Sequence, residues 1–132
     1  MKRSEQREHI FKTLFGIEFN APEEMEEQLM LYFEQREITG EKDCDYIKEK
    51  GKAIAKRVAE IDAMINEHAK GWKTTRMNKV DLTILRLAIY EMKWDDEVPV
   101  SVAINEAVEL AKGFGGEESP SFINGILAKL AE

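Results

Sequence analysis

The chain has 132 residues, of which 43% are hydrophobic and 34% charged, and its formal net charge is −7. A chain of this length can bury about two-thirds of its unfolded surface, so we expect a single, helix-rich globular domain rather than a disordered protein. No run of about twenty apolar residues is present to span a membrane. The charged start MKRSEQREHI is unlike a signal peptide, so we expect a cytoplasmic protein.

The sequence offers little for catalysis or metal binding. Cys44 is the only cysteine, which excludes an internal disulfide and suits a reducing compartment. Neither His9 nor His68 has a second ligand at zinc spacing. The phosphate-binding pattern G-x-x-x-x-G-K-[ST] is absent, and no Ser or Cys stands in the context of a nucleophile. We therefore expect no metal, no cofactor and no enzymatic activity.

The charges are unevenly distributed along the chain. The first twelve residues carry four basic and two acidic side chains, whereas residues 18–49 carry eleven acidic and three basic ones. The overall excess of acid argues against nucleic-acid binding, because phosphates require a basic surface. The basic N-terminal segment is the exception, and the acidic segment is an expected solvated face.

The first half of the chain shows three helical patterns. Residues 4–19 repeat apolar side chains at helical spacing, and a second helix is expected from Pro22 to about Ile38, with Gly40 as its stop. A long third helix is expected from about Asp45 to Gly71. Its apolar positions alternate in steps of four and three, as in a seam between packed helices: Ile47, Gly51, Ile54, Val58, Ile61 and Ile65. Trp72 follows and is predicted to cover the core.

The second half contains the most apolar helix. Asn78 is a predicted N-cap with Asp81 at the third helical position, and the helix continues to Trp94, before Pro99. We expect this helix to be central. The next helix, residues 100–112, is predicted to bury Ile104, Ala107, Val108 and Ala111. After the turn 113–116, Ser119 is a predicted N-cap, and Pro120 the first residue, of a last helix. No alternating pattern predicts a β-strand.

The residues alone leave one binding hypothesis open. Phe114 and Phe122 flank a glycine-rich turn before a helix N-terminus, and Arg3 and Arg7 share a helix face. Aromatic rings and basic side chains bind single-stranded RNA without catalytic groups. If the turn lay beside the arginines, they would form a small RNA site. Otherwise the aromatics are core residues and the arginines belong to a solvated helix start.

Three segments resemble the NusB transcription antitermination family: DLTILRLAIYEM at residues 81–92, VP with VAINEAVELAK at 98–112, and FG through FINGIL at 114–127. The resemblance is dense in the C-terminal half and looser in the first helix. It implies an all-α fold of about seven helices in two small packed bundles. It also implies binding of boxA RNA together with ribosomal protein NusE, within the RNA polymerase antitermination complex on rRNA operons.

The resemblance further implies which residues bind. The family's basic N-terminal motif falls on Lys2, Arg3 and Arg7, although Ser4 and Gln6 stand where more basic residues are usual. The RNA-facing turn falls on the following residues: Phe114, Gly115, Glu118, Ser119 and Phe122. The protein partner is expected at Asp81, with His68 nearby. Two alternatives remain: the RNA-binding module of an RNA methyltransferase, or a helical adaptor or homodimer that binds no RNA.

Overall fold

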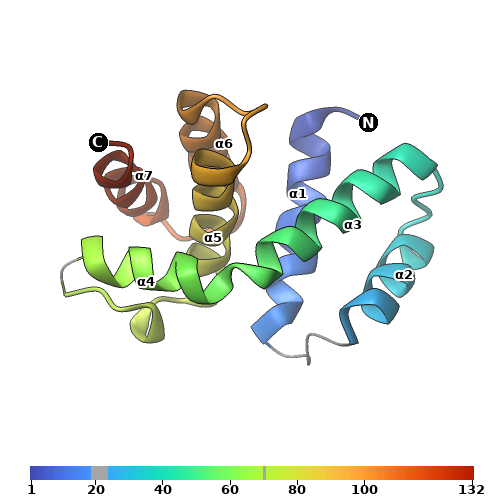
Figure 1. Ribbon diagram of the computed structural model, residues 1–132, viewed down its shortest axis with the longest axis horizontal. Coiled ribbons are helices and arrows are strands. Elements are labelled where there is room, and N and C mark those ends of the chain that lie inside the picture. The colour runs from blue at the N-terminus through green and yellow to red at the C-terminus, as the bar shows by residue number, and fades with distance from the viewer. Residues whose placement is uncertain (19–23, 70) are drawn as a thin grey trace. The chain divides into compact units, whose positions relative to one another are not determined.

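The computed structural model describes residues 1–18, 24–69 and 71–132, and these residues contain seven α-helices and no strand (Figure 1). The prediction of an all-α fold is confirmed. The helices divide into two compact units, Met1–Lys56 and Arg57–Glu132, as expected for two small bundles. The expectation of a single domain stays a prediction. In the described part of the chain, no helix has both the length and the apolar character needed to cross a membrane.

The first unit contains α1 (Arg3–Leu14), the 3-10 helix η1 (Phe15–Glu18), α2 (Met25–Gln35) and α3 (Glu41–Lys56). Helix α3 packs against both α1 and α2, and the core between them is apolar. The predicted first helix is confirmed, although its last turn tightens into η1. The predicted start of the second helix at Pro22 lies outside the described residues. This helix ends at Gln35, earlier than expected, because Glu37 adopts a positive φ of 55°.

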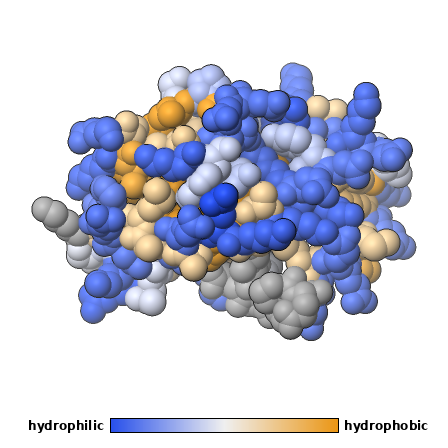
Figure 2. All heavy atoms as spheres, in the orientation of Figure 1, coloured by the Kyte–Doolittle hydropathy of each residue, from blue (hydrophilic) through white to orange (hydrophobic). Residues whose placement is uncertain are grey.

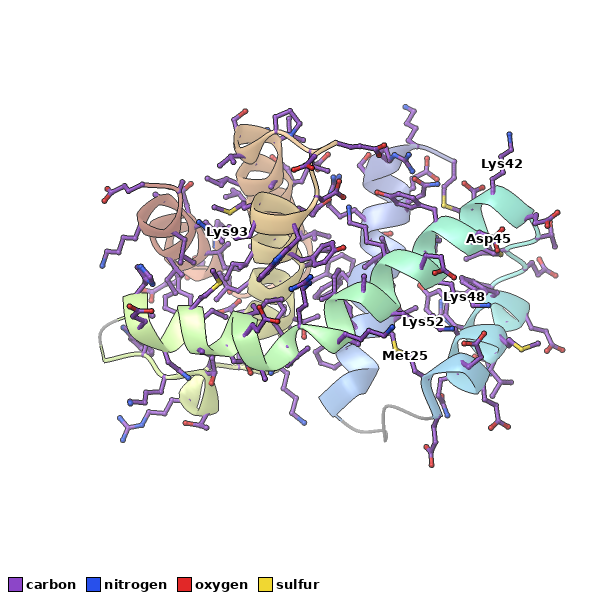
Figure 3. All side chains as sticks on the ribbon, viewed as in Figure 1. Met25, Lys42, Asp45, Lys48, Lys52 and Lys93 are labelled. Atoms are coloured by element: carbon purple, nitrogen blue, oxygen red, sulfur yellow. The ribbon has the colours of Figure 1, made fainter. Side chains whose placement is uncertain are left out.

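Ion pairs join α2 to α3 at the surface. Glu26 of α2 pairs with Lys48, at 2.7 Å, and with Lys52. Figure 3 shows both lysines on the side of α3 that faces Met25 and the rest of α2. Their hydrogen bonds lower the pKa of the Glu26 carboxyl group, and the same contact raises the pKa of Lys48. Part of the acidic charge of α2 is therefore neutralised within the unit.

The long third helix predicted from Asp45 to Gly71 is wrong as a single element. It is interrupted at Arg57, whose φ and ψ of −108° and 9° depart from helical values, and α4 (Val58–His68) follows. Ile47 and Ile54 are buried in the first unit, and Ile61 and Ile65 in the second. The predicted apolar seam is real, but its halves serve two separate cores, and the helix breaks where the seam passes from one to the other.

The second unit is built around α5 (Lys79–Trp94), which packs against α4, α6 (Val100–Phe114) and α7 (Ser119–Leu130). The prediction of a central helix is confirmed, since every residue from Asp81 to Ile89 is buried. The predicted cap is confirmed too, because the side-chain oxygen of Asn78 accepts from the Asp81 N–H at 2.8 Å. At the other end, Lys93 donates to the carbonyl of Leu130 at 2.8 Å (Figure 3).

An ion pair connects α4 to α5. Arg86 is buried on α5, and its guanidinium group donates to both carboxylate oxygens of Asp62, at 2.9 and 2.8 Å. This two-point contact is the geometry in which an arginine and a carboxylate bind most strongly.

Two details of the last helices differ from the predictions. Helix α6 buries Ala103, Ala107, Leu110 and Ala111, whereas Ile104 and Val108 are only half-buried. The small alanines face the neighbouring helices because they permit close approach, whereas the β-branched Ile104 and Val108 lie at the edge. The N-cap position of α7 is Glu118 rather than Ser119, and the Glu118 side chain makes no capping hydrogen bond. The Ser119 hydroxyl instead accepts from the Gly116 N–H at 3.0 Å.

Candidate functional site

A surface pocket of about 490 Å³ lies in the second unit, between the segment that precedes α5 and the turn that precedes α7. Its wall contains Trp72 and Arg76 from the first segment and Glu118 from the turn, and the first turns of the two helices add Asp81 from α5 and Ser119 and Phe122 from α7. A larger groove, about 950 Å³, lies along α6 and α7, but Glu106 is the one ionisable residue among those described that line it. The smaller pocket combines charged and aromatic groups, as a specific binding site requires.

The aromatic wall of the pocket consists of Trp72 and Phe122. Their ring centroids are 5.5 Å apart and their planes are inclined by 70°, which is an edge-to-face contact. Trp72 was predicted to cover the core, and this is wrong, because 55% of the residue is exposed. The chain turns at Gly71, whose φ of 78° favours glycine, and the tryptophan ring packs on Phe122 instead of entering the core.

Asp81 supplies the most buried charge of the pocket, with 6% of the residue exposed. Its Oδ2 accepts from the Asn78 side-chain amide at 3.1 Å. Within the described residues, no donor lies in hydrogen-bond range of its other oxygen, Oδ1, which is buried. A buried acceptor without a partner costs about 1–3 kcal/mol. The site therefore holds a carboxylate oxygen whose hydrogen-bonding capacity is unused.

The turn between α6 and α7 is closely packed. A Cβ atom on Gly115 would lie 2.6 Å from the side chain of Ser119 and 2.9 Å from the carbonyl oxygen of Ala111. Only glycine fits there without a shift of the turn. Phe114 is partly exposed at the end of α6, and Glu118 is exposed at the start of α7. Glycine and serine therefore shape the turn, while Phe114 and Glu118 present side chains to solvent.

The predicted basic residues lie in the first unit. Lys2 and Arg3 are exposed, and the Arg3 guanidinium lies 3.8 Å from the centre of the Tyr46 ring on α3. Lys50 donates to the hydroxyl of the same tyrosine at 3.1 Å. Arg7 is only 6% exposed. Arg3 and Arg7 therefore do not present equal surfaces, although they are one helical turn apart.

Other ionisable groups have structural contacts. The ring nitrogen Nδ1 of His68 donates to the carbonyl of Met64 at 2.9 Å, near the end of α4. Nδ1 of His9 lies 2.7 Å from the Tyr32 hydroxyl, and burial, with a contribution from Lys12, lowers the pKa of His9 below its usual 6.5. No three His, Cys, Asp or Glu side chains come together as metal ligands in the part of the chain that the structure describes.

Comparison with known proteins identifies the family. The model of the NusB family matches residues 4–132. The chain belongs to the NusB family. A transcription antitermination protein NusB from Agathobacter rectalis is 50% identical over 131 residues, which cover 99% of this chain and all of that one. The protein of the same name from Lachnoclostridium phytofermentans is 49% identical over 132 residues, the full length of both chains.

Solved structures of NusB proteins share the fold of this family member. NusB from T. maritima is 32% identical, with a TM-score of 0.84 over 99% of this chain and 91% of that one. A second neighbour comes from a crystal structure of NusB and NusE with double-stranded RNA, with a TM-score of 0.81 over 99% of this chain and 98% of that one. At 22% identity, this second comparison bears on the fold alone.

The structure brings together only some of the residues that the sequence and the family resemblance suggested. Asp81, Glu118, Ser119 and Phe122 line one pocket, although the resemblance assigned Asp81 to a protein partner and the others to RNA. Sequence reasoning missed Trp72 and Arg76 as members of this site. An aromatic residue directly after the end of a helix was the one available signal, and it was interpreted as core. For this NusB-family chain, the binding roles of all these residues stay predictions.

Proposed function

We propose that this chain is a transcription antitermination factor that binds boxA-type single-stranded RNA together with ribosomal protein NusE, within the RNA polymerase antitermination complex on rRNA operons. The observation that carries the proposal is the 50% identity to a named antitermination protein over essentially the whole chain. A NusB of the same fold has been crystallised with NusE and RNA, which supports both partners. The proposed location is the cytoplasm, where RNA is transcribed in bacteria.

The proposed RNA contacts come from two segments. Lys2 and Arg3, both exposed, bind phosphates, while Phe114 and Phe122 contact unpaired bases. Arg7, on the same helix as Arg3, is only 6% exposed, so we propose that it contributes positive charge without touching RNA directly. Gly115 and Ser119 hold the turn, and Glu118 lies at its edge. Tyr46 keeps the Arg3 guanidinium in place from below, at 3.8 Å from its ring centre.

The proposed partner surface is the start of α5, at Asp81, with His68 at the end of α4. A ribosomal protein is typically basic, so the acidic charge of this chain favours its association while repelling free RNA. The joint surface then binds RNA better than either protein alone. The mechanism is assembly, and we propose no catalytic step.

A gel-shift titration with boxA RNA tests the proposal, with a scrambled RNA as the control. We expect sequence-selective binding that NusE strengthens. Arg3→Ala should weaken binding and reduce the dependence of affinity on salt by about one phosphate contact. Lys56→Ala, at the far end of α3, removes the same charge and should leave the salt dependence unchanged. Absence of selective binding with and without NusE would instead support a helical adaptor that binds no RNA.

A further inference from the structure

We propose that the pocket between Trp72 and Phe122 receives one unpaired nucleobase and selects guanine. The inference rests on the RNA binding proposed above, adds to it a base-specific contact and two residues, Trp72 and Arg76, and assigns the Asp81 carboxylate to the base rather than to NusE.

The aromatic rings of the pocket leave room for stacking. In an edge-to-face pair one ring uses only its edge, so its faces stay free. Trp72 is more than half exposed, which agrees with an indole face open to solvent. Stacking on an aromatic face is a sequence-tolerant way to hold an unpaired base. The pocket volume of about 490 Å³ admits a base and part of its ribose.

The acceptor groups of the pocket determine which base fits. Asp81 Oδ1 lacks a donor among the described residues, and the exposed carboxylates of Glu117 and Glu118 line the same pocket. A carboxylate accepts hydrogen bonds and donates none. Guanine presents two adjacent donors on its Watson–Crick edge, N1–H and the N2 amino group. Uracil, cytosine and adenine each place an acceptor beside a donor there, which a carboxylate repels.

A rotation of the Asp81 carboxylate turns Oδ1 towards the bound base. Oδ1 of Asp81 is buried, although the residue lines the pocket wall. The terminal torsion of an aspartate is broad, so the carboxylate turns towards a guest at little cost. Guanine then satisfies an oxygen that has no partner in the free protein. The rotation also moves Oδ2 away from the Asn78 amide, so the two donors of guanine replace one existing hydrogen bond and add one to the oxygen that had no partner.

The guanidinium group of Arg76 binds the phosphate of the nucleotide at the rim of the pocket. Among the described residues that line the pocket, Arg76 is the one basic side chain, and it is exposed. Three carboxylates inside the pocket repel a phosphate, so the base enters and the phosphate stays at the rim beside the guanidinium group. A lysine or arginine of a protein partner is the competing guest, because aromatic rings and carboxylates also attract cations. The experiment below separates the two.

The test uses the full chain and short oligouridines that carry one central guanosine, adenosine, cytidine or uridine, each titrated with and without NusE. We expect wild-type protein to prefer the guanosine oligomer by roughly tenfold. Trp72→Ala should weaken that oligomer by roughly tenfold. Asp81→Asn should abolish the preference for guanosine, because the amide removes the charged acceptor that distinguishes guanine from the other bases. Circular dichroism checks that each variant is folded.

Two controls make the assignment specific. Arg76→Ala should reduce the salt dependence of binding, whereas Lys73→Ala removes the same charge from an exposed residue that does not line the pocket and should not. Quenching of tryptophan fluorescence by the guanosine oligomer should disappear in Trp72→Phe, because the remaining Trp94 is not at the pocket.

Three outcomes would overturn the inference. If Trp72→Ala and Asp81→Asn bind boxA RNA and all oligomers as wild type does, the pocket does not hold a base, while the proposed function stands. If Trp72→Ala weakens NusE binding and leaves RNA binding unchanged, the pocket holds a side chain of the partner. If wild type binds neither boxA RNA nor any oligomer, even with NusE, the inference and the proposed function both fall.

Discussion

The ion pair between Arg86 and Asp62 should contribute strongly to the stability of the second unit. Arg86 is buried on α5 and donates twice to Asp62, whose side chain is 22% exposed. Removing one member of a fully buried pair costs about 3–5 kcal/mol, because the other charge is left without a partner. Asp62 can still contact water, so we expect Arg86→Met to lower the free energy of unfolding by about 2–3 kcal/mol.

Urea denaturation of a double-mutant cycle measures this loss. Arg86→Met leaves an unpaired carboxylate, whereas the double variant with Asp62→Leu removes both charges and should lose less than the single variant. A matched control is the pair of Lys112 and Glu109 on α6, which is 3.4 Å apart with both side chains more than half exposed. Lys112→Met should cost less than about 1 kcal/mol.

The result that would refute this reasoning is specific. If Arg86→Met unfolds at the same urea concentration as Lys112→Met, burial does not strengthen the pair. If the double variant loses as much as the sum of the two single variants, the guanidinium and carboxylate groups act independently, and the two hydrogen bonds do not couple α4 to α5.

Three further predictions concern separate residues. Burial lowers the pKa of His9 in the folded state, so the unfolded state binds the proton first as pH falls. The free energy of unfolding should therefore decline below pH 6.5 and level off below the pKa of the folded state. His9→Gln should flatten that decline in urea titrations. Gly115→Ala forces a shift at Ser119 and should lower the free energy of unfolding by about 1–3 kcal/mol, whereas Gly113→Ala, where a Cβ meets nothing within 4 Å, should not. Glu118→Gln should strengthen RNA binding in gel shifts by removing repulsion from phosphates, and unchanged or weaker affinity would count against that repulsion.

The sequence predicted those features that depend on neighbouring residues. The Asn78 cap and the buried α5 follow from a capping residue and from apolar side chains on every face, and both are local signals. The break at Arg57 has no such signal, because the seam keeps its spacing from Ile54 to Val58 and Ile61 across it. Its cause is the change of packing partners, which periodicity does not record.

The candidate site was only partly predictable for the same reason. Phe122 and Glu118 were found through the turn to which they belong, but the contact of Phe122 with Trp72 joins segments on either side of α5 and α6. Arg7 was expected on a polar surface from the charged residues around it. Its burial, like that of Gln6, follows from packing within the folded chain. The exposed Trp72 and the buried Arg7 both show that residue type alone was a poor guide to exposure.

The acidic character of the chain becomes understandable once the pocket is considered. A net charge of −7 opposes a polyanion, and the carboxylates of Asp81 and Glu118 place part of that repulsion inside the proposed site. Repulsion between the carboxylates and phosphate weakens the binding of every RNA equally. A carboxylate forms hydrogen bonds only with a base that offers donors, so acids in the pocket weaken the binding of the wrong sequence most. A basic partner then restores the lost attraction without restoring non-selective binding by the free chain. We therefore expect weak binding by the free chain and selective binding in the joint complex from one set of charges.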